Sequence, residues 1–281
     1  MDNLITAFDS RQVGSGPPIE VKLASTILDW RSLDVDPYVI RENANREKQR
    51  FEPTSEVLSS DPIAVVAYGP SLADTWTELR NFKHIITCSG AHRFLLAHDI
   101  VPTHHVESDP RIHKADMLGE PDKRVEYLVA SICHPRYFYK LRDCNVKLWH
   151  LLFQDRRIYN LVDKGEWLLT GGNTVGPRAI KIARLLGFTN LHMFGFDGSG
   201  KHAASHLNPP PERKYRECHY HGKTFQTTEH LFTHVELLFQ DLNYIPDATF
   251  EFHGEGLIQE IAKDWRYDFK AGYPLAVVKD D

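Results

Sequence analysis

The stretch IAVVAYGPSLADTW, residues 63–76, decides how the chain folds. Its first five residues are apolar and follow Asp61-Pro62, which is the pattern of a fully buried strand. Gly69-Pro70-Ser71 then breaks the strand, and residues 72–79 have the composition of a helix. A glycine turn between a strand and a helix presents free backbone N–H groups and the positive end of the helix dipole, so this turn predicts a phosphate site.

Each residue of the Gly69-Pro70-Ser71 turn has a use in such a site. Gly69 lets the backbone approach a ligand closely or adopt positive φ, Pro70 fixes the turn, and Ser71 caps the helix or donates its hydroxyl. The same residue types also occur in strand–helix turns that bind nothing. Whether a ligand binds here therefore depends on what else in the chain reaches the turn.

Composition and charge narrow the class of protein. The 281 residues are enough for one large domain, or for one domain with an extension, and 42% hydrophobic with 25% charged residues is ordinary for a soluble globular protein. The net charge of −5 argues against a general nucleic-acid binder. No apolar run reaches the length of a membrane span, and the N-terminus lacks the pattern of a signal peptide. The four cysteines lack CxxC spacing, so we expect reduced thiols in a cytoplasmic protein.

Strand and helix patterns alternate along the middle of the chain. After residues 63–67, more short strands are expected at residues 84–88, 103–108, 127–131, 146–151 and 190–196, with helical segments between them. This alternation specifies an α/β domain with a largely parallel sheet. We expect residues 1–60 to form an N-terminal extension with helical character that packs on this domain, which occupies residues 61–281.

The remaining segments include a second glycine turn and, after it, a polar segment rich in proline and histidine. The turn Gly171-Gly172-Asn173-Thr174 opens a helix whose basic residues Arg178, Lys181 and Arg184 lie on a different face from its apolar ones. Residues 199–226 are polar and rich in proline and histidine, so we expect a long loop or a lid. An amphipathic helix over 227–243, a strand over 248–254 and a helix over 256–265 complete the domain.

Four segments with suggestive residues follow strands or open helices. They are Gly69-Pro70-Ser71, residues 107–111, Gly171-Gly172-Asn173-Thr174, and residues 197–199. Ligands of open α/β sheets bind outside the carboxyl ends of the strands. If these segments converge, two glycine turns and several carboxylates form a nucleotide pocket.

The carboxylates in these segments each have two interpretations. Glu107 and Asp109 are two apart on a strand, so both can face one side and hold a divalent cation, or Asp109 merely caps the turn at Pro110. Arg111 can bind a phosphate or carboxylate, or simply pair with Asp109. Asp197 can bind a ribose or a substrate hydroxyl, or serve only as a turn residue.

The histidines of the last third suggest either a metal or acid–base chemistry. His202 and His206 are four apart, as are His230 and His234, and Cys218, His219 and His221 lie between the pairs. A zinc site is disfavoured because no second cysteine pair is present. We favour His202 or His206 as a general base or phosphate contact in the lid, with His230 and His234 on the surface or groove side of their helix.

A series of segments resembles one known family. GPSL, CSGAH, IVPTHHVESDPR, GGNTVGPRAIKIARLLGF and HMFGFDGS occur in that order. They resemble the family that joins archaeal 6-hydroxymethylpterin diphosphokinases to bacterial motility-associated-factor flagellin glycosyltransferases. The resemblance covers roughly residues 61–206, and its most specific parts are GPSL, SDPR, GGNTVG and FGFDGS.

The resemblance implies a Rossmann-like, three-layer transferase domain that binds a nucleotide over the GPS turn. Carried over by position, the resemblance implies phosphate binding by Gly69, Pro70 and Ser71, nucleotide contacts by Gly171, Gly172, Asn173 and Thr174, and a contact of Asp197 with the donor or acceptor. Ser89 and Arg111 complete the set of candidate nucleotide- and substrate-binding residues. Asp109 is implied at the catalytic strand end, and His202 and His206 join it as candidate catalytic residues.

Two enzyme hypotheses and one binding hypothesis follow. The first is a glycosyltransferase that moves a sugar from a nucleotide monophosphate, of the CMP-nonulosonate type, to a hydroxyl of a small molecule, glycan or protein, with no metal required. The alternative is a diphosphokinase that uses ATP and Mg²⁺ held by Glu107 and Asp109. This chain has ESDPR where the diphosphokinases carry a paired acidic segment, which favours the first. The third hypothesis is a non-catalytic nucleotide-binding module. None involves nucleic acid or a membrane span.

Overall fold

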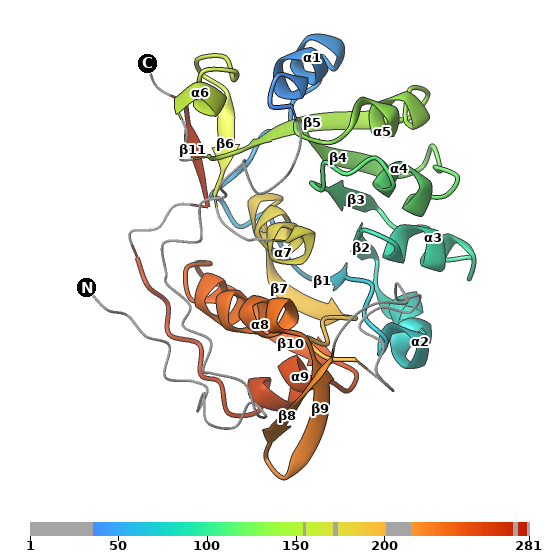
Figure 1. Cartoon of the computed structure of the whole chain (residues 1–281), viewed down its shortest axis with the longest axis vertical. Helices are drawn as coiled ribbons and strands as arrows, with labels where there is room; N and C mark the ends of the chain where they lie inside the picture. The colour runs from blue at the N-terminus through green and yellow to red at the C-terminus, as the bar shows by residue number, and fades with distance from the viewer. Residues whose placement is uncertain (1–35, 154–155, 171–173, 201–214, 272–274, 280–281) are drawn as a thin grey trace.

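The protein is built on one large, mostly parallel sheet (Figure 1). The computed structural model describes residues 36–153, 156–170, 174–200, 215–271 and 275–279. Within them, the sheet has nine strands in the order β10-β7-β1-β2-β3-β4-β5-β6-β11, and all but β11 run parallel. The strands are β1 Ser59–Val66, β2 His84–Cys88, β3 His104–Glu107, β4 Glu126–Ala130, β5 Asn145–Leu151, β6 Trp167–Leu169, β7 Phe188–Phe194, β10 Thr249–His253 and β11 Ala276–Val278.

Short helices connect most of the strands, and one antiparallel hairpin stands apart from the sheet (Figure 1). The helices are α1 Val39–Arg46, α2 Leu72–Thr75, the 3₁₀ helix η4 Trp76–Asn81, α3 Ala91–Leu96, α4 Lys114–Met117, α5 Pro135–Lys140, α6 Arg156–Tyr159, α7 Val175–Leu185, α8 Glu229–Leu242 and α9 Leu257–Ala262. The hairpin consists of β8 Arg216–Tyr220 and β9 Lys223–Thr227. No helix in the described ranges is long and apolar enough to cross a membrane.

Strand β1 is an inner strand of the sheet, third in the order, and its two faces contact two separate layers of the core. Its last four residues are fully buried, which confirms the buried strand expected from the sequence. Successive side chains of a strand point to opposite faces, so Ala64 and Val66 pack with apolar residues of α2, η4 and α3, while Ile63 and Val65 belong to the core that contains α7. The expected three-layer α/β arrangement is therefore confirmed.

The strand order reverses beside β1. The chain runs from β1 through β2 to β6 on one side, and then returns to place β7 on the other side of β1. In parallel doubly wound sheets, the gap beyond the carboxyl ends of the strands at such a reversal is where ligands bind. The turns after β1 and β7 flank this point.

Helix α7 is buried all round. It packs on β7, β1, β2 and β3, and its basic residues Arg178, Lys181 and Arg184 are each at most 4% exposed. The sequence placed these basic side chains on a different face from the apolar ones, and in the structure that face is buried as well. The Lys181 ammonium lies 3.0 Å from the Asp241 carboxylate of α8, and the Arg184 guanidinium donates to the carbonyls of Ser55 and Pro246.

Element boundaries differ from the sequence expectations in several places. The helix expected over residues 72–79 is split between α2 and η4, and the strand expected to reach residue 196 ends at Phe194, because the chain turns through Gly195 at a φ of +68°. Strands β6 and β11 are additional. Of the lid expected over residues 199–226, the described part includes the β8–β9 hairpin. Thr228 is the N-cap of α8, since its hydroxyl accepts from the Leu231 N–H.

The described part of the N-terminal extension packs on the main domain. Helix α1 contacts α5, and the buried Asn43 amide donates to the carbonyls of Ser131 and Cys133. The division of the chain at residue 60 itself stays a prediction.

Candidate functional site

A cavity of about 580 Å³ lies where the strand order reverses. Its walls are the turns after β1, β2, β3 and β7, the start of α7, and one side of α8. Six of the residues predicted from the sequence line it together: Gly69, Ser89, Asp109, Arg111, Thr174 and Asp197. Described residues of the four suggestive segments therefore converge on one cavity.

The other predicted residues fall into two groups. Pro70, Ser71 and Glu107 are described but do not line the cavity. The remaining residues, Gly171, Gly172, Asn173, His202 and His206, lie outside the described residues. Their binding and catalytic roles stay predictions.

The GPS turn is fastened to the turn after β7. The Ser71 N–H and hydroxyl donate to the two carboxylate oxygens of Asp197, at 2.8 and 2.5 Å. The Gln259 amide donates to the same carboxylate at 3.0 Å. Ser71 and Asp197 are both buried, and burial raises the pKa of Asp197 although these hydrogen bonds oppose the shift.

This fastening changes the roles expected of Gly69 and Ser71. A Cβ on Gly69 would lie 2.4 Å from the Gly195 carbonyl oxygen and 2.5 Å from a carboxylate oxygen of Asp197. Glycine is therefore required by the contact between two turns, and φ of Gly69 is not positive. Ser71 makes no side-chain capping bond to α2, because its hydroxyl is directed at Asp197.

The segment after β3 carries a compact group of charges. The Arg111 guanidinium lies 2.5 Å from the Asp109 carboxylate, and the Lys114 ammonium lies 3.4 Å from it. Lys114 also donates to the Ser89 hydroxyl at 2.9 Å. Burial alone would raise the pKa of Asp109, but the hydrogen bond from Arg111 and the Lys114 charge outweigh it, so that pKa is lowered.

Glu107 lies behind this group. Its side chain is buried, and one of its carboxylate oxygens accepts from the N–H groups of Ser108 and Asp109 at 2.8 and 3.0 Å. Burial raises its pKa, with Lys114 opposing the shift. Glu107 and Asp109 thus stand in different environments, each with protein partners of its own.

The start of α7 faces the cavity and adds to its positive side. Thr174 occupies the N-cap position with extended backbone, without a side-chain capping bond. Arg178, in the following turn, is 4% exposed and donates to the Ser108 hydroxyl at 2.7 Å. Burial lowers its pKa to about 10, so the guanidinium stays charged at neutral pH. The helix N-terminus, Arg178, Lys114 and Arg111 together favour an anion.

Several cavity residues were not in the predicted set. Lys114, Tyr68 and Arg178 line the cavity, as do His230 and His234 of α8, whose ring centroids are 4.0 Å apart. The spacing of four between the histidines placed them on one helix face, and of the two positions expected for them, the surface or the groove side, they occupy the groove side. No sequence pattern predicted Lys114 at the cavity, because its position depends on where α4 begins.

Cys88 also lines the cavity but does not supply a nucleophile. Burial, reinforced by the Glu107 charge, raises the pKa of its thiol to about 12. A thiol that stays protonated at neutral pH is a poor nucleophile.

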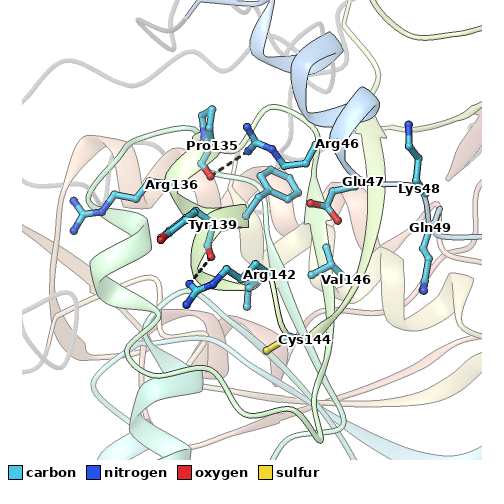
Figure 2. Close-up of a pocket in the computed structure, with 12 residues that line it drawn as sticks. Arg46, Glu47, Lys48, Gln49, Pro135, Arg136, Tyr139, Arg142, Cys144 and Val146 are labelled. Atoms are coloured by element: carbon cyan, nitrogen blue, oxygen red, sulfur yellow. Dashed lines mark hydrogen bonds between the residues drawn. The ribbon is translucent and has the colours of Figure 1, made fainter.

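A second hollow lies at the opposite end of the strands. It measures about 760 Å³ and lies between α1, α5 and the start of β5 (Figure 2). The Arg142 guanidinium stands over the Tyr139 ring at 4.7 Å, and Arg46 donates to the Pro135 carbonyl. None of the predicted site residues lines this hollow, and it lies at the amino end of β5, away from the reversal of strand order.

The fold and the cavity together define an α/β protein with a cationic pocket at the reversal of its strand order. The chain belongs to the MptE-like family: the model described as 6-hydroxymethylpterin diphosphokinase MptE-like matches residues 39–201. No functionally curated protein matches the chain in sequence.

The solved structures that match the chain include a glycosyltransferase and a sialyltransferase. The MAf glycosyltransferase from Magnetospirillum magneticum AMB-1 is 19% identical with a TM-score of 0.58, and the match covers 82% of this chain and 39% of that one. The present chain therefore spans about two fifths of the length of that protein. A mammalian sialyltransferase in complex with Gal-β-1-3GalNAc-ortho-nitrophenol is 12% identical with a TM-score of 0.36, over 82% of this chain and 90% of that one.

Proposed function

We propose that the chain is a transferase whose donor is a phosphate-bearing nucleotide held in the cavity beside β1. The observation that carries the proposal is the convergence of three cationic side chains, Arg111, Lys114 and Arg178, with the N-terminus of α7 around one cavity. Membership of a family described by a diphosphokinase, and a fold like that of a solved glycosyltransferase, support a transferase.

For the donor, we propose a sugar activated by a nucleoside monophosphate, of the CMP-nonulosonate type. One phosphate suits a cavity whose positive groups lie close together, and Arg111 and Lys114 both contact the Asp109 carboxylate, at 2.5 and 3.4 Å. The predicted binding residues that line the cavity, Gly69, Ser89, Arg111, Thr174 and Asp197, would surround this donor. The acceptor is a hydroxyl of a small molecule, a glycan or a protein.

The reaction needs a base and a leaving group. The acceptor hydroxyl gives its proton to the base, its oxygen forms a bond to the anomeric carbon, and the bond from that carbon to the phosphate oxygen breaks. The nucleoside monophosphate leaves with the electron pair, and the cations beside α7 stabilise its added charge. His202 and His206 stay the predicted bases, and His230 and His234 are the described imidazoles that face the cavity.

Asp109 has a positioning role in this scheme. Its carboxylate holds Arg111 and Lys114 together, at 2.5 and 3.4 Å. Because its pKa is lowered, it stays ionised and keeps both cations in place.

The family description favours a second candidate, a diphosphokinase that uses ATP and Mg²⁺. In that case Glu107 and Asp109 would hold the metal. Magnesium would have to displace the Arg111 and Lys114 side chains that now contact Asp109. Its other ligand, Glu107, is 1% exposed and already accepts hydrogen bonds from backbone N–H groups. This arrangement ranks the metal-dependent reaction second.

Equilibrium binding distinguishes the candidates. We expect CMP to bind by calorimetry in the presence of EDTA, and Lys114→Met and Arg111→Gln each to weaken binding by about 10- to 100-fold, because each removes a charged contact to phosphate. Arg124→Gln is the matched control: Arg124 pairs with Asp122, two residues before it, in the same geometry as Arg111 with Asp109, but outside the cavity.

Other outcomes select other functions. Binding of ATP that needs Mg²⁺, with AMP released when a pterin is supplied, would replace the glycosyltransferase with the diphosphokinase. If Asp109→Ala and His206→Ala leave binding intact and neither donor class is ever turned over, the chain is a non-catalytic nucleotide-binding module. If neither nucleotide binds, the proposal fails.

A further inference from the structure

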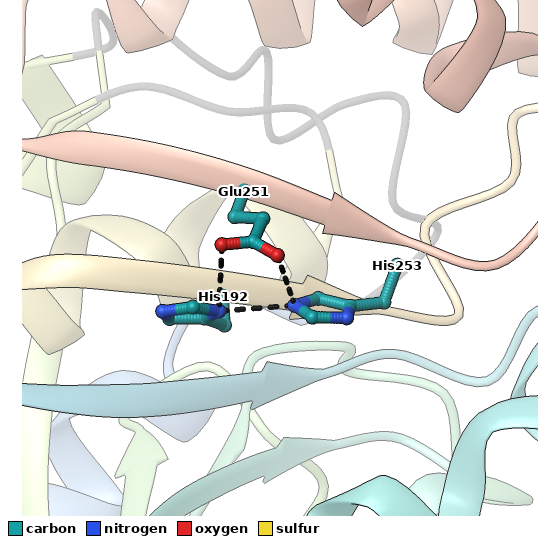
Figure 3. A group of neighbouring side chains, drawn as sticks. All are labelled: His192, Glu251 and His253. Atoms are coloured by element: carbon teal, nitrogen blue, oxygen red, sulfur yellow. Dashed lines mark hydrogen bonds and ion pairs between the residues drawn. The ribbon is translucent and has the colours of Figure 1, made fainter.

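A second group of side chains lies on the sheet outside the candidate cavity (Figure 3). His192 of β7 pairs in register with Glu251 of β10, and His253 follows two residues later on β10. Side chains two apart on a strand share a face, and so do residues paired across two strands. The three side chains therefore meet on one face of the edge of the sheet.

The three groups form a triangle of ligand atoms. His192 Nδ1 lies 3.0 Å from His253 Nε2. One carboxylate oxygen of Glu251 lies 3.5 Å from His192 Nδ1, and the other lies 3.5 Å from His253 Nε2. Ligand atoms bound to one tetrahedral zinc ion at about 2.0–2.2 Å are separated from one another by about 3.3–3.6 Å. The two contacts to Glu251, which end on its two different oxygens, lie within this range, and the distance between the imidazole nitrogens is slightly shorter.

The surroundings hold the two imidazoles in place for such a role. The Nδ1 atom of His253 lies 3.1 Å from the Glu78 carboxylate of η4, which directs the Nε2 lone pair toward the triangle. The His253 ring stacks on Phe194, with centroids 4.0 Å apart, and the edge of Phe82 packs on His192 at 5.1 Å. A carboxylate behind a metal-binding imidazole is the usual outer partner of such ligands.

Hydrogen bonding alone satisfies this group less well. A single proton can join the two imidazole nitrogens, but both contacts to Glu251 are then 3.5 Å long, at the outer limit of a hydrogen bond. A metal ion between the three groups would satisfy all of them at once. Imidazole nitrogen and carboxylate oxygen are ligands that zinc accepts.

We propose that His192, Glu251 and His253 bind a divalent transition-metal ion of the zinc type. The side chain of Glu251 is 62% exposed while both histidines are mostly buried, so the fourth ligand position faces solvent. The ion joins the edge strand β10 to β7, and through Glu78 to η4. It is separate from the donor site proposed above and does not depend on it.

Cobalt binding to the full-length chain tests the site. We expect metal-free protein to bind Co²⁺ with the visible absorption bands of low-coordinate cobalt, and to bind Zn²⁺ competitively. His192→Gln and His253→Gln are expected to abolish this signal, and Glu251→Gln to weaken binding at least tenfold. Glu78→Gln, which changes only the outer partner, is expected to weaken it by about 10- to 100-fold.

Controls separate this site from the other histidines. His84→Gln removes a strand histidine 3.8 Å from the Asp61 carboxylate, outside the triangle, and should leave binding unchanged. Zn²⁺ should raise the melting temperature of the wild type and of His84→Gln, and should raise that of Glu251→Gln by less, because weaker binding stabilises the folded state less. Glu251 is exposed, so folding tolerates this change. The proposal is overturned if the wild type gives no cobalt signal. It is also overturned if His192→Gln and His253→Gln keep the signal while the double variant His202→Gln/His206→Gln loses it.

Discussion

Single residues fasten the GPS turn to the rest of the sheet. Ser71 uses both its N–H and its hydroxyl on Asp197, and Gly69 is in contact with the Gly195 carbonyl, so the turn after β1 and the turn after β7 behave as one unit. Glycine and serine suit this turn whether they bind phosphate or make the internal contact, so the sequence alone does not distinguish the two roles.

Replacing Ser71 by alanine should lower the free energy of unfolding by about 1.5–3 kcal/mol, because it removes a hydrogen bond to a buried carboxylate. Urea denaturation measures the change. Ser60→Ala, at an exposed position of β1, is the matched control and should have little effect. In an Asp197→Asn background the loss caused by Ser71→Ala should shrink; an equal loss in both backgrounds would refute the proposed partner.

The predictability of the site differs from residue to residue. Asp109 and Asp197 could be expected at the cavity because they come directly after strands, and the carboxyl ends of parallel strands share an edge. Lys114 and His234 could not, since their positions depend on how α4 and α8 pack. The partner of Ser71 was also beyond prediction, because Asp197 is 126 positions away along the chain.

At the scale of elements, the α7–α8 contact depends on a buried ion pair. Lys181 and Asp241 are 2% and 4% exposed in their side chains and lie 3.0 Å apart. Breaking a buried pair leaves an uncompensated charge, which costs far more than an exposed pair contributes.

Lys181→Met should therefore destabilise the protein by about 3–5 kcal/mol, because it leaves the buried Asp241 carboxylate without its cationic partner. The double variant Lys181→Met/Asp241→Leu should recover most of that loss, as measured by thermal or urea unfolding. Arg136→Met, which breaks an exposed pair with Asp116 at 2.9 Å, serves as the control and should cost less than about 1 kcal/mol. A double variant as unstable as the single one would contradict the assignment.

Strands of about five residues with a clear apolar pattern were predictable, and strands of three residues were not. The strand over residues 84–88 was predicted with the bounds that β2 has, because five residues bounded by polar ones leave little freedom. Strands β6 and β11 have three residues each, too few to show a period. The burial of the basic side of α7 was not predictable either, because the partner of Lys181 belongs to another helix.

Across the whole molecule, the core contains a network of polar rings. His105 lies between the Thr87 hydroxyl, at 3.0 Å, and the Tyr137 hydroxyl, at 2.8 Å. His92 lies 3.0 Å from the Tyr127 hydroxyl. Burial holds the pKa of His105 well below its usual range and lowers that of His92 to about 4, so both are neutral in the folded protein.

This network makes stability depend on pH. His92 titrates at about 4 when folded and at 6.5 when unfolded, so its contribution is complete above pH 6.5 and is lost as the pH falls toward 4. Between pH 7 and pH 5 we expect His92 to account for a loss of about 2 kcal/mol. The raised pKa of Glu236, about 7 because of burial, acts in the opposite direction over this range.

The measurement is therefore a comparison of two proteins. Urea unfolding at pH 7 and at pH 5 should show a smaller pH-dependent loss for His92→Gln than for the wild type, whatever the stability of the variant at pH 7. His219→Gln, on the exposed β8–β9 hairpin, controls for the loss of an imidazole. An unchanged pH dependence in His92→Gln would show that His92 is not protonated on unfolding.

The pairing of β1 with β7 also determines when the cavity can form during folding. Ile63 lies beside Leu191, so the cavity closes only after most of the chain has emerged and the returning strand has docked. Contacts between such distant segments form late in folding. Anything that binds in the cavity would recognise the finished protein alone: it would slow unfolding and proteolysis without hastening folding, and a newly synthesised chain would acquire that protection only at its last step.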